Sequence, residues 1–374
     1  MAWLSRTRLL AVARKEVLQL RRDRRSLILA FVMPLVLLVL YSYAISWDVR
    51  HIATAVVDQD RSAKSRELLD AFRGSGYFLL DRHLDRVADA EPLVDAGRVQ
   101  LVLVIPPDFS RRLGSGRPAE VQALVDGSDA NTATIVVGYT QAVVQDFSAR
   151  VLLRGATARL PLAADTRVWF NEELVSRNMI VPGLVAVIMM IIAAMLTSLT
   201  IAREWERGTM EQLAATPVSR LEVVLGKLLP YLGIGLVDVV VISVAGVLIF
   251  HVPFRGDPLL FLVLSTAYLI GVLGLGLFIS AVTRSQLLAT QLGMILTFLP
   301  SFLLSGFMFA ISAMPPPLRL VTYVVPARYF LVVTRGIFLK GVGVEVLFVQ
   351  GLLMIAFAAL GLALAVRVFR KELA

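Results

Sequence analysis

Six long apolar runs constrain the fold of this chain more than any other feature of its sequence. Crossing the hydrocarbon core of a bilayer takes roughly 20 consecutive apolar residues in a helix, and each run reaches about that length. A mean hydropathy of +0.76 and 57% hydrophobic residues exceed what a soluble core of this size needs. We therefore expect an α-helical membrane protein with six transmembrane helices, at residues 27–46, 180–201, 223–250, 259–282, 287–311 and 342–366.

A long polar segment, residues 47–178, separates the first apolar run from the other five. It alternates charged residues with short apolar stretches and is long enough to form a domain with its own core. β-Branched stretches predict strands, and helical periodicity predicts helices between them. We expect an α/β, or α+β, domain inserted between transmembrane helices 1 and 2, with strands at 52–57, 99–105 and 121–125 and helices at 62–73, 85–97 and 131–154.

Basic residues set the expected orientation. Lys and Arg beside a span stay in the cytoplasm, and eight of them precede the first apolar run. The N-terminus and, by counting spans, the tail 367–374 are therefore expected to be cytoplasmic, and the 47–178 domain extracytoplasmic. Because this charge lies beside the membrane, the net charge of +9 gives no support for nucleic-acid binding. The eight residues are Arg6, Arg8, Arg14, Lys15, Arg21, Arg22, Arg24 and Arg25.

Residues 1–26 predict a helix that lies along the cytoplasmic surface of the bilayer. Its apolar residues fall on one face among Arg and Lys, as in other interfacial helices. A solvated helix leading into the first span is the alternative. The apolar face consists of Leu9, Leu10, Ala13, Val17 and Leu20.

The sequence contains no recognisable catalytic constellation. A phosphate-binding loop needs the string G-x-x-x-x-G-K-[ST], and no such string occurs. The chain has no cysteine, and His51, His83 and His251 are too widely separated for a metal site. We expect a protein that is not an enzyme and that binds no cofactor itself.

The loop after the second apolar run predicts a short helix between two spans. Thr209 followed by Gln212 fits a capping box, and Gly208 allows a turn before it. Ser219 with Glu222 forms a second capping box, which predicts the start of the third transmembrane helix.

One face of this short helix is apolar, because Met210, Leu213 and Ala214 follow the i, i+3, i+4 spacing. An apolar face on a charged loop suits a groove on another protein, and helix-in-groove docking can transmit a rigid-body movement. A capped turn lying against the lipid headgroups is the alternative.

The segment at residues 203–217 resembles the signature that follows the second span in ABC-2 type transporter permeases. Its sequence is R-E-W-E-R-G-T-M-E-Q-L-A-A-T-P. This family contains bacterial multidrug and related exporters with a one-plus-five layout of helices. The resemblance covers the whole chain. Further matches lie at 15–25 (K-E-V-L-Q-L-R-R-D-R-R), 181–186 (V-P-G-L-V-A), 326–330 (P-A-R-Y-F) and 335–341 (R-G-I-F-L-K-G).

The resemblance implies a coupling helix at 203–217 that docks on a separate cytoplasmic P-loop ATPase subunit, which holds ATP and Mg. It also implies two permease subunits, identical or paralogous, in the lipid bilayer of a bacterial inner membrane, and it allows a periplasmic adaptor. Segment 312–341 is implied to be re-entrant on the outer side, with Arg328 and Arg335 buried or interfacial. The implied ATPase-coupling residues are Glu204, Glu206, Arg207, Thr209, Met210, Glu211 and Leu213.

Asp238 lies within the third apolar run. A carboxylate near the middle of a bilayer is costly and usually faces the interior of a helix bundle or a water-filled path. Asp238 is therefore a candidate for the translocation path. A structural partner for a polar residue on a neighbouring helix is the alternative.

These patterns predict the permease subunit of an ATP-driven exporter of a hydrophobic or amphiphilic compound. A membrane-anchored receptor or scaffold is one alternative, although an anchor needs no capped helix on a cytoplasmic loop. A secondary transporter driven by an ion gradient is the other alternative. Such transporters commonly carry internal repeats, and none is evident in this sequence.

Overall fold

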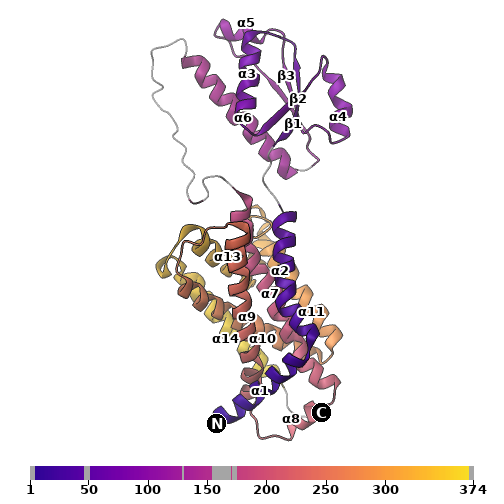
Figure 1. Cartoon of the computed structure of the whole chain (residues 1–374), viewed down its shortest axis with the longest axis vertical. Coiled ribbons are helices and arrows are strands. Elements are labelled where there is room, and N and C mark those ends of the chain that lie inside the picture. The colour runs from indigo at the N-terminus through magenta and orange to yellow at the C-terminus, as the bar shows by residue number, and fades with distance from the viewer. Residues whose placement is uncertain (1–4, 46–50, 129, 154–169, 171–174, 370–374) are drawn as a thin grey trace. The chain divides into compact units, whose positions relative to one another are not determined.

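The computed structural model describes residues 5–45, 51–128, 130–153, 170 and 175–369. The chain divides into two compact units, one made of Met1–Ile45 and Val168–Ala374 and the other of Ser46–Arg167. The first unit is a bundle of helices, and the second contains a β-sheet (Figure 1).

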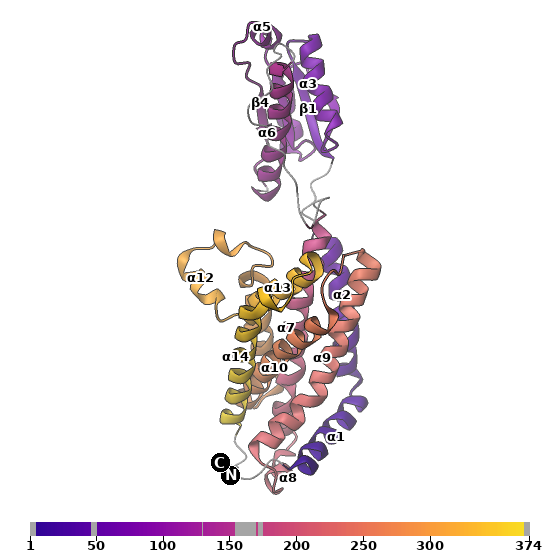
Figure 2. The same ribbon diagram turned by 90° about the vertical axis from the view of Figure 1, so that its left-hand side faces the viewer.

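The helical unit contains six helices that are long and apolar enough to cross a membrane, counted over the described residues. This number agrees with the expected six spans, and the bent helix pair described below would make a seventh if it is a broken span. Several ends differ from the prediction, and the fifth span ends at Leu304 instead of residue 311. Two shorter helices, α1 (Arg6–Arg22) and α8 (Met210–Ala214), lie at the same end of this unit, as Figures 1 and 2 show. The six are α2 (Arg24–Ala44), α7 (Ser176–Glu206), α9 (Arg220–Phe250), α10 (Pro258–Thr283), α11 (Gln286–Leu299) continued by the π-helical turn η2 (Pro300–Leu304), and α14 (Val344–Val368).

Helix α7 is the central helix of this unit. It packs against α2, α9, α10 and α11, and 89% of its most apolar stretch is buried. Its hydroxyl groups bond within the helix: Thr197 Oγ1 donates to the Ala193 carbonyl at 3.0 Å, and Ser198 Oγ donates to the Met195 carbonyl at 2.9 Å. Because these hydroxyls are satisfied locally, they need no polar partner from a neighbouring helix.

Glycines let α10 approach two neighbouring helices closely. A Cβ atom at Gly274 would lie 2.8 Å from the backbone carbonyl carbon of Gly361 in α14. A Cβ atom at Gly276 would lie 2.6 Å from the carbonyl oxygen of Ala194 in α7. Larger residues would push these backbones apart, so the helix spacing depends on both glycines.

A bent helix pair precedes α14. Helix α12 (Pro316–Thr322) meets α13 (Pro326–Arg335) and its π-helical extension η4 (Gly336–Lys340) at an angle of 77°. Such a pair is either a broken span or a re-entrant loop, and the re-entrant outer segment at 312–341 stays a prediction. Arg328 and Arg335 are both partly buried, as expected.

The second unit is built on a four-stranded sheet with strand order β2-β1-β3-β4. Strand β1 pairs in parallel with β2 and β3, and β4 is antiparallel to β3. Successive side chains of β3 point to opposite faces of the sheet and belong to two different cores. Leu103 packs with α3, α5 and α6 on one face, and Val102 packs with η1 and α4 on the other. The extracytoplasmic location of this unit stays a prediction. Its elements are β1 (Ile52–Asp58), α3 (Ala63–Gly74), β2 (Phe78–His83), η1 (Val87–Ala90), α4 (Glu91–Asp95), β3 (Leu101–Ile105), α5 (Phe109–Gly114), β4 (Gln122–Val125) and α6 (Ala130–Leu153).

Candidate functional site

The loop that resembles a coupling helix begins at the end of α7. Helix α7 continues past its apolar stretch through Arg203 and ends at Glu206. Gly208 then adopts a φ of +69°, a left-handed conformation that glycine reaches without steric strain. The chain turns there into α8, at the end of the bundle that the basic residues predict to be cytoplasmic.

The two predicted capping boxes have different outcomes. Thr209 precedes α8, but its side chain makes no cap hydrogen bond and its hydroxyl turns back toward α7 instead. The predicted box between Thr209 and Gln212 is therefore wrong. The box at Ser219 and Glu222 is confirmed, with N–H to side-chain distances of 2.7 and 3.3 Å. Glu222 also accepts a hydrogen bond from the Ser5 N–H at 2.7 Å, which joins the start of α1 to the start of α9.

The seven implied ATPase contacts divide between the surface and the interior. Four are accessible and three are buried. Glu206, Arg207 and Glu211 are exposed and Thr209 is half-buried, whereas Glu204, Met210 and Leu213 are buried.

The apolar face of α8 is directed inward. Met210 is 2% exposed and Leu213 is 8% exposed, and both belong to the core that the spans form. The expectation of an exposed apolar face that awaits a groove on another protein is therefore wrong. The i, i+3 spacing correctly identified an apolar face, but the chain itself supplies the surface that covers it.

A buried cluster of charges holds the last turn of α7. Lys227 of α9 donates to Glu16 of α1 at 2.5 Å and lies 3.1 Å from Glu204 of α7. Lys15 of α1 donates to the same Glu204 oxygen at 2.6 Å. The side chains of Lys227, Glu16 and Glu204 are 1–3% exposed. Two cations and two carboxylates thus join three helices.

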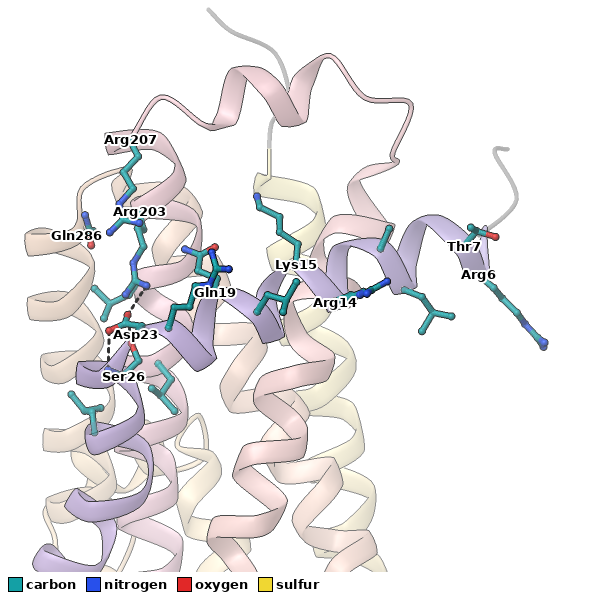
Figure 3. Close-up of a pocket in the computed structure, with 17 residues that line it drawn as sticks. Arg6, Thr7, Arg14, Lys15, Gln19, Asp23, Ser26, Arg203, Arg207 and Gln286 are labelled. Carbon is teal, nitrogen blue, oxygen red and sulfur yellow. Dashed lines mark hydrogen bonds and ion pairs between the residues drawn. The ribbon is translucent and has the colours of Figure 1, made fainter.

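A separate ion pair ties α7 to the junction between α1 and α2. Arg203 Nη1 lies 2.7 Å from Asp23 Oδ2, and Asp23 also accepts from the Ser26 N–H at 3.2 Å (Figure 3). Burial raises the pKa of Asp23, but the hydrogen bonds from Ser26 and the charge of Arg203 lower it more, so the net pKa lies below its ordinary value. Asp23 is therefore an anion at neutral pH and pairs with Arg203.

A third set of contacts connects α7 to the start of α11. The Gln286 N–H donates to Glu206 at 2.7 Å. The Arg284 guanidinium lies over the Trp205 ring, 4.4 Å from the ring centre, in a cation–π contact. The last turn of α7 is therefore fixed to α1, α9 and α11 at once.

The sequence patterns did not predict the charge cluster. The one sequence feature that pointed to the cluster is Lys227. It falls within the predicted span at 223–250, where an ionisable residue needs a partner. Its partner Glu16 is 211 residues away in sequence, and helical periodicity alone does not connect residues at that separation.

Asp238 lies apart from this cluster, eleven residues beyond Lys227 in α9, which is about 16 Å along a helix. It is 2% exposed and lies three residues after Gly235, whose face meets Leu269 of α10. Its Oδ2 atom is buried and has no hydrogen-bond partner in the described part of the chain. Asp238 thus faces the protein interior, while its role in a translocation path stays a prediction.

Comparison with known proteins identifies one family. The family described as ABC-2 family transporter protein matches residues 24–367, from the start of α2 to the last turn of α14. The chain is 38% identical over 366 residues to the probable multidrug ABC transporter permease YbhS of Escherichia coli strain K12, with 96% of each chain covered. It is 29% identical over 339 residues to the probable multidrug ABC transporter permease YbhR of the same strain, covering 91% of this chain and 92% of that one. The inner membrane transport permease YhhJ of that strain is 28% identical over 328 residues, with 85% of each chain covered.

Proposed function

The chain belongs to the ABC-2 transporter family and is a permease subunit, and we propose that a separate cytoplasmic P-loop ATPase drives its transport. That partner holds ATP and Mg, since this sequence has no phosphate-binding loop of its own. Two permease subunits, identical or paralogous, form the transport path in a bacterial inner membrane.

The way in which α8 is attached to α7 is the observation that supports this coupling. The buried side of α8, Met210 and Leu213, is part of the bundle core. Its accessible side and the residues before it, including Arg207 and Glu211, present charges to the surroundings. Because ion pairs hold the last turn of α7 to its neighbours, a force on α8 passes into the central helix instead of bending a loose loop.

The exported compound is, in this proposal, hydrophobic or amphiphilic. Two relatives are named as probable multidrug permeases. Asp238 is the candidate path residue, because its buried Oδ2 atom, which has no hydrogen-bond partner among the residues that the structure describes, is available to a polar group of a substrate. The α/β unit, placed outside the cytoplasm in this topology, is the part that would meet a periplasmic adaptor.

Co-purification tests the ATPase partner and its docking surface. The variant Arg207→Glu/Glu211→Lys exchanges two exposed charges and keeps the net charge. The matched control Arg117→Glu/Glu120→Lys makes the same exchange at exposed positions of the α/β unit. Each protein is purified in mild detergent after expression beside candidate P-loop ATPases.

We expect the wild type and the control to retain an ATPase subunit, and the Arg207→Glu/Glu211→Lys variant to lose most of it at equal membrane levels. Full retention by that variant would exclude this docking surface. If no ATPase follows even the wild type, an ion-gradient transporter or an anchored receptor becomes the function to pursue.

A further inference from the structure

A cleft of about 1360 Å³ lies between α1 and the adjoining ends of α2, α7 and α11 (Figure 3). We call it the basic cleft, because its lining includes Arg6, Arg14 and Arg22 of α1 together with Arg203 of α7 and Arg207. Among the described residues that line it, Asp23 is the single acidic one. The positive charge of the cleft is therefore only partly compensated.

Most of these cations have no carboxylate partner. Arg203 pairs with Asp23. Over the residues that the structure describes, no carboxylate pairs with Arg6, Arg14, Arg22 or Arg207, and the buried Nε atom of Arg203 has no hydrogen-bond partner either. Like charges held together in this way attract an anion.

The cleft also contains apolar residues of the spans. Leu29 belongs to the first turns of the α2 span, and Leu199 belongs to α7. On α1, Leu10 and Leu18 line the cleft and are 62% and 47% exposed. Exposed leucines among arginines are typical of a helix at the interface between hydrocarbon and water. Such a helix, which the sequence predicts for residues 1–26, would place its arginines near the depth of lipid phosphates.

We propose that the basic cleft binds an anionic phospholipid, with the headgroup phosphate at the α1 arginines and Arg203 and the acyl chains against the leucines. An acidic protein surface would match the charge but would leave the leucines of the spans uncovered, and so would a soluble phosphate. The inference needs only insertion of the chain in a bilayer. The cleft shares Arg207 with the proposed ATPase docking surface, so the headgroup is assigned to the α1 arginines and Arg203, which the docking variant leaves unchanged.

Such a lipid would contact α1 and α7 at once. These two helices are already joined by the ion pair between Lys15 and Glu204, and Lys15 also lines the cleft. A bound headgroup would screen the repulsion between Arg203 and the arginines of α1. Anionic lipid would therefore stabilise the same end of the bundle that carries α8.

Lipid binding to the full-length protein, purified in mild detergent, can be measured by native mass spectrometry. The probes are phosphatidylglycerol, phosphatidylcholine and glycerol phosphate. We expect phosphatidylglycerol to bind at least tenfold more tightly than phosphatidylcholine, and glycerol phosphate to show no saturable binding. Arg14→Gln/Arg22→Gln is expected to weaken phosphatidylglycerol binding about 25-fold, because each basic residue near an anionic lipid contributes roughly fivefold.

A matched control separates the cleft from general surface charge. Arg21→Gln/Arg24→Gln removes the same charge from exposed positions of the same segment that do not line the cleft, and it is expected to bind as the wild type does. Arg14→Lys/Arg22→Lys keeps the charge and should retain most of the binding, which guards against misfolding of the glutamine variant.

Several outcomes would overturn the proposal. Equal affinity for phosphatidylcholine would mean that the cleft is only an apolar groove. Saturable binding of glycerol phosphate would indicate a site for soluble anions. An equal loss in the Arg21→Gln/Arg24→Gln control would indicate a non-specific charge effect. If Arg14→Gln/Arg22→Gln kept its lipid and lost a co-purifying ATPase, the cleft would be a protein docking surface.

Discussion

Replacing Lys227 with methionine tests the charge cluster that joins α1, α7 and α9. Methionine keeps the apolar stem of lysine but lacks the charge. Glu16 and Glu204 would then lose their shared cation at a site where each side chain is 3% exposed. Glu204 would still have Lys15 as a partner. Glu16 would be left as a buried carboxylate without its cation, and this accounts for most of the expected loss of stability.

The expected losses in the free energy of unfolding differ among the variants. Removing one member of a buried ion pair costs about 3–5 kcal/mol, because the remaining charge is left desolvated. The side chain of Lys15 is 47% exposed, and an ion pair with that much solvent contributes about 0–1 kcal/mol. Glu16→Gln added to Lys227→Met removes the unpaired charge and should restore about 0.5–3 kcal/mol of the loss.

Thermal inactivation of the purified protein gives the ranking. Because unfolding of such proteins is commonly irreversible, half-lives at one fixed temperature are compared. We expect Lys227→Met to have the shortest half-life, Lys15→Met to resemble the wild type, and Glu16→Gln/Lys227→Met to lie between them. Equal half-lives for Lys227→Met and Lys15→Met would refute the argument that the buried Lys227 contributes more to stability than the half-exposed Lys15.

Three further predictions concern single positions. Asp238→Asn should reduce export at equal membrane levels without lowering thermal stability, since the buried Oδ2 atom has no hydrogen-bond partner among the described residues that the change could remove; undiminished export measured in vesicles would remove Asp238 from the path. Because the native pKa of Asp23 lies below 3.8, its pairing stabilises the fold above that pH and is lost as the pH falls through the native pKa. Asp23→Asn should therefore destabilise at neutral pH and flatten the acid limb of a thermal-stability profile, and an unchanged acid limb would contradict this. Gly274→Ala should destabilise by about 1–3 kcal/mol through overpacking against α14, whereas Gly233→Ala, with open space around its Cβ position, should be neutral or slightly stabilising in the same assay.

The spans were predictable because each depends on a local apolar run. Helix α7 nevertheless extends to Glu206, five residues beyond the predicted end at 201, since a helix does not need to stop where its apolar residues stop. The side chain of Glu206 finds a partner at the start of α11. The sequence contains no local sign of that contact.

Two misjudged elements show what local patterns leave out. Strand β2 was not predicted, because Phe78 and its apolar neighbours are followed by the charged residues Asp81 and Arg82. Charged residues are compatible with β2 because it is an edge strand, which exposes alternate side chains. Met210 and Leu213 were correctly assigned to one face. Periodicity identifies an apolar face but not which surface covers it, and here the bundle core covers it.

The hydrogen bonds that the hydroxyls of α7 make inside their own helix bear on how the protein is made. During synthesis α7 emerges before α9, α10 and α11. A hydroxyl that depended on those later helices would face lipid unpaired in the meantime, at a cost of several kcal/mol. Thr197 and Ser198 bond to carbonyls within α7. Helix α7, which is largely buried in the folded bundle, can therefore insert into the bilayer before α9, α10 and α11 are present to pack around it.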